Sequence, residues 1–582
     1  MKAKFTNVEK AFFTKSHLNK PKTKIPYIQV DNIPDLGFLT SLRFLEWVLE
    51  NPRGVISLPT GKTPEYFIKW TQYILSNWDK PEVEQLCKDN GLNTNKKPKL
   101  NHLKFVQIDE FYPINPLQHN SFYYFVQKFY IEGFGLNPKN SLLINSFEIP
   151  NSIDESIENI FPNYKIDLSL RYRDTNSDIE EKQKQTIFAI DQWCSEYENK
   201  IADLGGIGFF LGGIGPDGHI AFNVRGSDHN STTRILETNF ETQATSASDL
   251  GGIEISRNRL VITIGLSTIT KNSDVIVIIF AAGRSKAKIV KDSLEKRKDI
   301  NFPATALSDS IGSRFYLTKG ASYLLDEKNI NATDWSTEEI NRELIKLCTN
   351  LNKFGSRLTQ KDIIDNQSTS SIPNINNNTS TLFLDQMKQK IQKSSDLPMN
   401  NTILHTGPHH DDILLGYSPV INHLVRSAEN TNYFAVMTSG FTSVTNKYIS
   451  NLLSETLKLI NSDKIQMIKY PDFFDNGFKL KKAKDVYHYL DKVASQNTFG
   501  KTRGLCHRMV RSLVDIYSLK SIDDLVVKIN DIIQYFASCY DGEKNPPDIQ
   551  RLKGMLREFE EELVWAHYGV DIKNIYHLRL GF

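Results

Sequence analysis

The chain has 582 residues, enough for at least two domains that each bury a hydrophobic core. Its 70 lysines and arginines nearly balance its 68 aspartates and glutamates, so the formal net charge of +2 gives no reason to expect a nucleic-acid partner. The five cysteines lie far apart without any C-x-x-C pair, which supports neither a disulfide framework nor a zinc ribbon and fits a cytoplasmic location. No stretch reaches the ~18 apolar residues that a membrane span needs, and the basic N-terminus lacks an apolar signal segment, so we expect a soluble protein.

The first part of the chain, residues 25–350, alternates short apolar runs with longer polar segments that suit helices. This alternation predicts an α/β domain with a Rossmann-like, mostly parallel sheet flanked by helices. The run Val275–Phe280 is apolar without alternation, which is typical of a central strand buried on both faces. The predicted strands are Val55–Leu58, Phe105–Ile108, Ile207–Leu211, Leu260–Ile264, Val275–Phe280 and Phe315–Leu317.

A polar stretch rich in Asn, Ser and Thr, residues 359–395, follows this domain. Such a composition cannot bury enough apolar surface to offset its ordering entropy, so we interpret it as an interdomain linker, with a surface loop of one domain as the alternative. Residues 396–582 then predict a second, partial α/β domain, with strands at Thr402–Leu404 and Tyr433–Met437. A large helical insertion is expected at about residues 444–555.

The first candidate binding loop follows the strand at Val55–Leu58. Thr60, Gly61, Lys62 and Thr63 come before Pro64, a residue suited to the first turn of a helix. Backbone amides at a helix N-terminus, together with the two hydroxyls, can hold a phosphate monoester. The alternative is an ordinary capped helix, and the spacing is not that of a P-loop nucleotide site.

Two further motifs carry candidate acid–base groups. Asp109 and Glu110 follow a predicted buried strand, and the carboxyl end of a strand is where open α/β sheets bind ligands. A carboxylate there could move a proton between adjacent sugar carbons, although a helix N-cap is the alternative for Asp109. Asp217 and His219 lie in a loop with four nearby glycines, which allow a ligand to approach the backbone closely, so His219 is a candidate acid–base group.

These three motifs, in this order, resemble the glucosamine-6-phosphate deaminase/isomerase family. Leu58–Pro64 corresponds to the family's phosphate loop, Asp109 to its proton-shuttling Asp, and Gly212–Asn223 to its ring-opening loop. The resemblance covers most of residues 25–330 and includes Lys286, where the family has a phosphate-binding Lys. The related 6-phosphogluconolactonases share the G-x-D-G-H core, but the residues after the histidine resemble those of the deaminases.

The resemblance implies a phosphosugar substrate and no metal or organic cofactor. His219 would promote ring opening, and Asp109 would move the C2 proton of glucosamine 6-phosphate to C1, giving fructose 6-phosphate and ammonia after hydrolysis. The implied catalytic residues are Asp109, Asp217 and His219, and the implied substrate-binding residues are Thr60, Gly61, Lys62, Thr63, Gly213 and Lys286.

Val224 departs from the family pattern, which has a histidine-orienting carboxylate at this position. Because valine cannot orient or charge-stabilise an imidazole, slowed catalysis is one expectation. The alternatives to a deaminase are therefore a catalytically degraded sugar-phosphate sensor or scaffold and a 6-phosphogluconolactonase-like hydrolase. The sequence leaves open whether the chain forms a homo-oligomer and indicates neither a nucleic acid nor a membrane as a partner.

The second domain carries one motif with metal-binding chemistry. His409, His410, Asp411 and Asp412 follow a predicted strand and resemble the first motif, H-P-D-D, of the PIG-L/LmbE family of zinc-dependent N-acetyl-sugar deacetylases, with His410 in place of Pro. The resemblance implies that His409 and Asp412 bind zinc and that Asp411 acts as base. The family's third ligand would lie beyond Phe582, so we expect either a truncated form or a lost metal site, and no deacetylase activity from these 582 residues.

Overall fold

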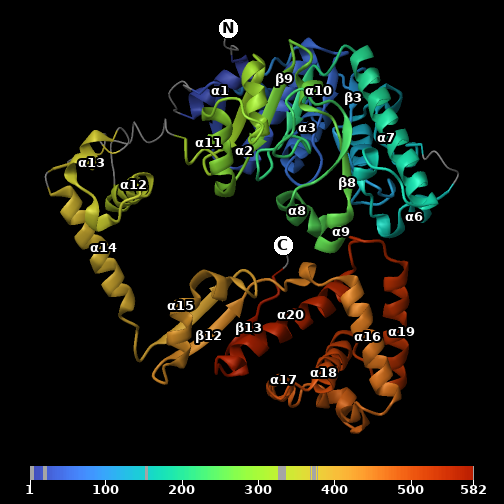
Figure 1. The fold of residues 1–582 in the computed structure, drawn as a ribbon, viewed down its shortest axis with the longest axis vertical. Coiled ribbons are helices and arrows are strands. Elements are labelled where there is room, and N and C mark those ends of the chain that lie inside the picture. Colours follow the sequence, from blue (N-terminus) through green and yellow to red (C-terminus); the bar gives the residue numbers. More distant parts are fainter. Residues whose placement is uncertain are drawn as a thin grey trace. The chain divides into compact units, whose positions relative to one another are not determined.

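The computed structural model describes residues 5–16, 23–150, 155–325, 336–366, 369, 372, 375–376 and 378–580 (Figure 1). The chain forms two compact units, Met1–Glu343 with Asn366–Asn374 and Leu344–Asp365 with Ile375–Phe582. The predicted linker, 359–395, contains two helices, α13 (Gln360–Asp365) and α14 (Thr379–Ser395), and its residues 367–368, 370–371, 373–374 and 377 lie outside the described residues. The domain limits expected from composition, 25–350 and 396–582, stay predictions.

The first unit is built on a seven-stranded sheet in the order β1-β10-β9-β6-β2-β3-β5. All six neighbouring pairs run parallel, as the predicted α/β class requires. The fully apolar strand β9 is an interior strand next to β6, which is in the middle. The strands are β1 (Tyr27–Val30), β2 (Val55–Ser57), β3 (Lys104–Val106), β5 (Ser141–Leu142), β6 (Phe209–Gly212), β9 (Ile276–Ala281) and β10 (Ser313–Thr318).

Successive residues of each strand point to opposite faces, so the sheet has a hydrophobic core on each side. On one side, Phe209 and Ile278 pack in a core with Phe44 of α2 and Phe67 of α3. On the other side, a core contains Phe210 and Val277 together with apolar residues of α7 and α11. Helices therefore cover both faces, which explains why the strands lack polar alternation (Figure 1).

The helices of the first unit differ widely in length. No helix in the described part of the chain is both long and apolar enough to cross a bilayer. The helices are α1 (Asn7–Lys15), α2 (Ile33–Glu50), α3 (Glu65–Ser76), α4 (Pro81–Asp89), α5 (Phe122–Val126), α6 (Ile157–Ile160), α7 (Asp178–Asp203), α8 (Phe240–Leu250), α9 (Ile253–Asn258), α10 (Leu266–Thr270), α11 (Ala287–Glu295) and, across the division between the units, α12 (Thr337–Asn350).

A small antiparallel sheet corrects one strand prediction. Leu260–Ile264 was expected in the parallel sheet, but its strand β8 (Leu260–Thr263) lies between β4 (Asp109–Tyr112) and β7 (Arg234–Glu237). All four residues of β8 are buried, with side chains in two different apolar clusters. A run that is covered on both faces has the same apolar pattern in either kind of sheet, so the pattern could not distinguish them.

The second unit combines a small sheet with a helical layer. Its three strands, β11 (Thr402–Gly407), β12 (Thr431–Val436) and β13 (Ile575–His577), are parallel, and Trp565 stacks on Phe434 at a ring distance of 4.0 Å. The expected helical insertion is present and has its own apolar core. The helices are α15 (Asp412–Arg426), α16 (Asn446–Asn461), α17 (Lys482–Ala494), α18 (Thr498–Tyr517), α19 (Ile522–Ser538) and α20 (Pro547–His567).

Candidate functional site

The carboxyl ends of four adjacent parallel strands bring the predicted motifs of the first unit to one edge of the sheet. These strands follow one another in the order β9-β6-β2-β3. From β2 the chain continues outward to β3 and β5, whereas from β6 it continues to β9 and β10 on the other side. The loops after β2 and β6 therefore diverge at a topological switch point, which is where open α/β sheets bind ligands.

The loop after β2 has the geometry of an anion site. Gly61 has a φ of +86°, and the helix that follows, α3, begins at Glu65 with Pro64 as its N-cap. No side chain caps this helix. The Glu65 amide donates to the Lys62 carbonyl oxygen at 3.3 Å, which leaves the amides that follow it available to a ligand. The Lys62 ammonium group is mostly exposed and lies 3.7 Å from the carboxylate of Asp249.

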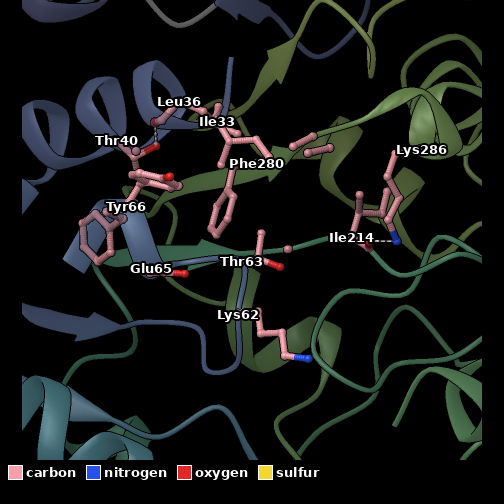
Figure 2. Close-up of a pocket in the computed structure, with 15 residues that line it drawn as sticks. Ile33, Leu36, Thr40, Lys62, Thr63, Glu65, Tyr66, Ile214, Phe280 and Lys286 are labelled. Atoms are coloured by element: carbon pink, nitrogen blue, oxygen red, sulfur yellow. Dashed lines mark hydrogen bonds between the residues drawn. The ribbon is translucent and has the colours of Figure 1, made fainter. Parts of the chain in front are cut away.

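A cavity of about 360 Å³ opens beside this loop (Figure 2). Four of the six predicted substrate-binding residues line it: Lys62, Thr63, Gly213 and Lys286. The Lys286 ammonium group donates a hydrogen bond of 2.9 Å to the carbonyl oxygen of Ile214, and burial lowers its pKa. The cavity thus places cationic and hydroxyl groups of the loops after β2 and β9, and the backbone of the loop after β6, around one space.

Glycine makes room for the imidazole of His219 in the loop after β6. A Cβ atom on Gly215 would lie 2.0–2.3 Å from three atoms of the His219 ring, and the Gly215 amide donates to the His219 carbonyl oxygen at 2.9 Å. Gly218 has a φ of +89°, which side chains rarely permit. The glycines of this motif therefore form a tight turn that holds the ring against the backbone.

Asp217 orients this imidazole. Its carboxylate Oδ1 lies 2.6 Å from His219 Nδ1, while Oδ2 accepts hydrogen bonds from Asn239 Nδ2 at 2.6 Å and from the Arg225 amide at 2.9 Å. Burial alone would raise the pKa of Asp217, but the hydrogen bond and charge interaction with His219 outweigh it and hold the pKa below its ordinary value. The orienting group that the sequence lacks at Val224 is thus supplied from two residues before the histidine.

Two buried polar residues fix this loop and were not predicted as site residues. The Asn223 amide group donates to the carbonyl oxygens of Ile220 and Ile264, at 3.0 and 2.9 Å. The Thr263 hydroxyl accepts a hydrogen bond of 3.2 Å from the Phe222 amide. Asn223 is the last residue of the Gly212–Asn223 motif and could have been identified from it. Thr263 and Asn239 lie in segments without a sequence motif that would indicate a functional site.

Asp109 begins β4 and is paired with Thr263 across the small sheet. Thr263 in turn contacts the residue three positions after His219, so one β8 residue connects the Asp109 strand to the histidine loop. Asp109 is 7% exposed, and no described residue donates a hydrogen bond to its carboxylate oxygens. Burial, and secondarily the charge of Glu110, raise the pKa of Asp109 well above its ordinary value.

Glu110 is held in a different environment from its neighbour. Its carboxylate accepts hydrogen bonds from the amides of Phe111, Phe122 and Tyr123 and from the Ser121 hydroxyl, at 2.7 to 3.0 Å. Burial raises the pKa of Glu110 to about 7, and these donors oppose a larger rise. Glu110 therefore anchors the start of α5, whereas the Asp109 carboxylate remains available for proton exchange.

The predicted metal ligands of the second unit, His409 and Asp412, lie close together at the start of α15. The backbone amide of His409 donates to Asp412 at 2.9 Å, and Nδ1 of His409 lies 2.8 Å from the Thr438 hydroxyl. Asp411 is the N-cap of α15. Among the described residues, no group of three potential ligands includes His409, Asp411 or Asp412. The pair does not supply the three protein ligands of a catalytic zinc.

Comparison with curated sequences gives matches to proteins named glucosamine-6-phosphate deaminase or isomerase. The chain is 38% identical to the glucosamine-6-phosphate isomerase of Candida albicans over 120 residues, which are 21% of this chain and 48% of that protein. It is 35% identical to the glucosamine-6-phosphate deaminase of Borreliella afzelii over 136 residues, 23% of this chain and 50% of that protein. The chain thus spans about half the length of these curated relatives. No family model matches it.

More extended but weaker matches cover the same half of the chain. Glucosamine-6-phosphate deaminase 1 of Giardia intestinalis is 23% identical over 310 residues, 53% of this chain and 94% of that protein. A solved structure of a monomeric glucosamine-6-phosphate deaminase covers 51% of this chain and 99% of its own, with 20% identity and a TM-score of 0.38. The sequence is therefore similar to glucosamine-6-phosphate deaminases over roughly its N-terminal half.

Replacing Asp217 by Asn tests the orientation of His219. The amide cannot both accept the Nδ1–H bond and stabilise a protonated ring, so we expect kcat to fall by about 10²-fold or more for any acid–base reaction at this site. The matched control is Asp203→Asn, at the exposed end of α7. Equal kcat values for Asp217→Asn and the control would contradict the orienting role.

Replacing Gly215 by Ala tests the position of the imidazole. The added methyl group would overlap the His219 ring, so the ring must move, and a displacement of about 1 Å is expected to cost about 10²-fold in kcat. Gly416→Ala is the control, because a Cβ there meets open space. Thermal unfolding of both variants would separate the loss of activity from the loss of folding.

Proposed function

We propose that the chain is an amino-sugar phosphate deaminase/isomerase that converts glucosamine 6-phosphate and water into fructose 6-phosphate and ammonia. The observation that carries this proposal is the placement of an Asp-held imidazole, a buried carboxylate and a cavity lined by two lysines on segments that follow four adjacent parallel strands. The names of the sequence relatives, each a glucosamine-6-phosphate deaminase or isomerase, support the same reaction.

The substrate phosphate would bind at the loop after β2. The uncapped amides of α3, the hydroxyls of Thr60 and Thr63 and the ammonium groups of Lys62 and Lys286 offer donors and positive charge to a dianion. Lys286 would exchange its hydrogen bond with Ile214 for the phosphate oxygen or share it between the two. Gly213 lines the same cavity and leaves space for the sugar.

His219 would open the sugar ring. Because Asp217 accepts the Nδ1–H bond, Nε2 is the nitrogen that exchanges protons with the substrate. A protonated ring can donate from Nε2 to the ring oxygen as the C1–O5 bond breaks, and the Asp217 carboxylate stabilises the positive charge of the imidazolium. This arrangement offers what a carboxylate at Val224 would otherwise provide.

Asp109 would then act as the proton shuttle. Its carboxylate removes the proton from C2 of the open-chain amino sugar, which gives an enolamine, and returns the proton to C1, which gives an imine at C2. Water adds to the imine carbon, and the C–N bond breaks to release ammonia and leave the ketone of fructose 6-phosphate. The steps use only proton transfers and water, so we propose that this unit needs no metal or organic cofactor.

For the second unit we propose a relationship to PIG-L/LmbE deacetylases without deacetylase activity. Support comes from parallel strands at Thr402–Gly407 and Thr431–Val436, the latter followed by a turn at Gly440 with a φ of +62°. A deacetylase fused to a deaminase makes chemical sense, because removal of the N-acetyl group produces a free amino sugar. We also propose a cytoplasmic location, where sugar phosphates are retained.

Turnover of glucosamine 6-phosphate tests the proposed reaction. We expect the purified chain to release equal amounts of ammonia and fructose 6-phosphate, and Asp109→Asn to lower kcat by about 10²-fold or more because the amide cannot accept the C2 proton. Substrate-induced thermal stabilisation without release of either product would contradict the proposal and favour a sensor. Hydrolysis of 6-phosphogluconolactone without action on the amino sugar would instead indicate a lactonase.

The pH dependence of kcat tests the role of Asp109 separately. Only the ionised carboxylate accepts the C2 proton, so kcat rises as the pH rises through the pKa of Asp109. Since burial and Glu110 raise this pKa, the acid limb should lie above the range of an ordinary aspartate, about pH 4. Saturating substrate removes the titration of the free substrate phosphate, and unfolding curves at each pH confirm that the protein is intact. A kcat that stays constant down to pH values near 4 would contradict this role.

A further inference from the structure

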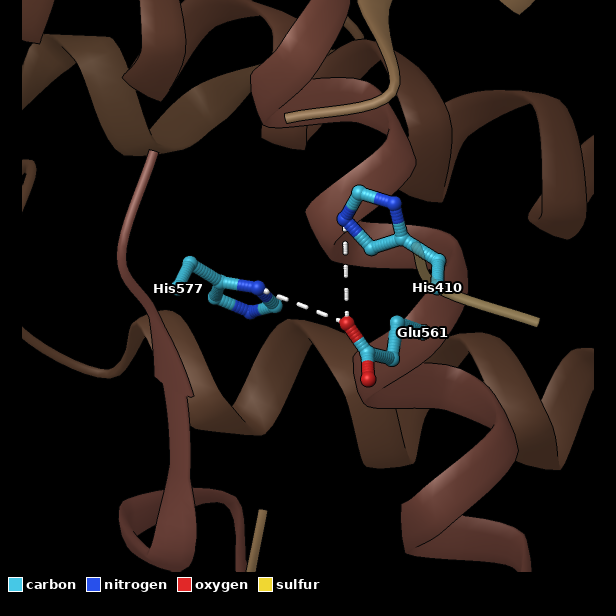
Figure 3. Close-up of side chains that lie close together, drawn as sticks. All are labelled: His410, Glu561 and His577. Atoms are coloured by element: carbon cyan, nitrogen blue, oxygen red, sulfur yellow. Dashed lines mark ion pairs between the residues drawn. The ribbon is translucent and has the colours of Figure 1, made fainter. Parts of the chain in front are cut away.

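A second cluster of potential ligands lies in the second unit, at a place separate from His409 and Asp412. Its members are His410, in the loop between β11 and α15, Glu561 on α20 and His577 at the end of β13. Each ligand atom lies within 4.8 Å of the others. Three elements that are far apart in the sequence thus direct ligating side chains to one point (Figure 3).

The geometry is close to that of a metal site. Glu561 Oε2 lies 3.7 Å from His410 Nε2 and 3.5 Å from His577 Nδ1. Two ligand atoms at about 2.0 Å from a tetrahedral metal ion are about 3.3 Å apart, so these two distances exceed the coordinated value by only a few tenths of an ångström. The ligating nitrogens of the two imidazoles lie within 4.8 Å of each other. Figure 3 shows both imidazoles facing the same carboxylate oxygen.

The ligand atoms have no other partners. Both ring nitrogens of His410 and of His577, and Oε2 of Glu561, are buried and form no hydrogen bond. His410 is 8% exposed and Glu561 is 3% exposed. A buried polar atom without a hydrogen bond is costly, and five of them on three neighbouring side chains, three of which face one point, indicate a missing bound group.

The neighbouring carboxylates do not share this deficit. Glu558 forms two hydrogen bonds with Arg579, and Glu562 pairs with Arg508. Glu561 uses its other oxygen, Oε1, to accept a hydrogen bond of 3.0 Å from Trp565 Nε1. This bond fixes the carboxylate plane and leaves Oε2 directed at the two imidazoles, as outer partners commonly do for metal ligands.

We propose that His410, Glu561 and His577 bind one divalent transition-metal ion, with zinc as the probe of choice. Two imidazoles and one carboxylate are a ligand set that zinc accepts, with a fourth position open to water. His409 is not part of this set, because its ring lies beside the Thr438 hydroxyl. The site is independent of the proposed deaminase reaction, which uses residues of the first unit.

Metal titration of the full chain tests the proposal. After removal of metal by a chelator and dialysis, we expect Zn²⁺ to bind with one equivalent per chain, to raise the Tm, and Co²⁺ to give the visible absorption of a four-coordinate site. Glu561→Gln and His577→Gln should each weaken Zn²⁺ binding by about 10²-fold or more.

Two control variants make the result specific. His409→Ala removes a ligand expected from the PIG-L/LmbE resemblance, and His567→Gln removes an exposed histidine at the end of the same helix, α20. Both variants should keep one equivalent of zinc. Circular dichroism of the metal-free variants confirms folding, and ammonia release should be unchanged in all of them.

Two outcomes would overturn the proposal. The first is zinc binding far below one equivalent by the folded parent chain. The second is binding that survives both Glu561→Gln and His577→Gln but is lost in His409→Ala, which would return the site to the loop at His409 and Asp412. A loss of ammonia release in the parent chain would concern only the proposed deaminase function, so the two failures can be told apart.

Discussion

The parallel alignment of β9, β6, β2 and β3 is the constraint on which the candidate active site depends. Because the four strands point the same way, their following loops all emerge at one edge, and β6 places the His219 loop between the loops that carry Thr63 and Lys286. Each strand is short and mostly apolar, so burial on both faces, and not the polar site residues, fixes its position. The site residues are therefore free to be optimised for chemistry.

Three buried carboxylates at this edge have different environments and hence different capacities. Asp217 accepts hydrogen bonds from His219, Asn239 and a backbone amide, which keeps it charged, and Glu110 is held by four donors. Asp109 is buried without such donors among the described residues, so its charge is the least stabilised of the three. This contrast supports the proposal that Asp109 transfers the proton while the other two carboxylates have positioning roles.

Much of this arrangement could be predicted from sequence, because apolar runs mark buried strands and closely spaced glycines mark functional loops. The sheet membership of β8 could not, since its apolar run is compatible with either kind of sheet. The sequence also directed attention to Val224 for the orientation of His219, whereas Asp217 provides it in the structure. Asn239, the N-cap of α8, donates to Asp217 in the same hydrogen-bond network. A local sequence pattern cannot predict this contact, because the two residues are twenty-two positions apart.

In the second unit, two adjacent histidines of one short motif have different environments. His409 and His410 are adjacent, yet the ring of the first is exposed and that of the second is buried against α20. Burial raises the pKa of Glu561 to about 8 and lowers the pKa of His410 and of His577 to about 4. Near neutral pH each imidazole is therefore uncharged and has one nitrogen without a proton. Burial thus disfavours the charged form of all three side chains. Arg579 and Arg508 pair with Glu558 and Glu562, so the point between His410, Glu561 and His577 is short of positive charge. The sequence gives no sign of this cluster, which forms only when β13 and α20 pack together.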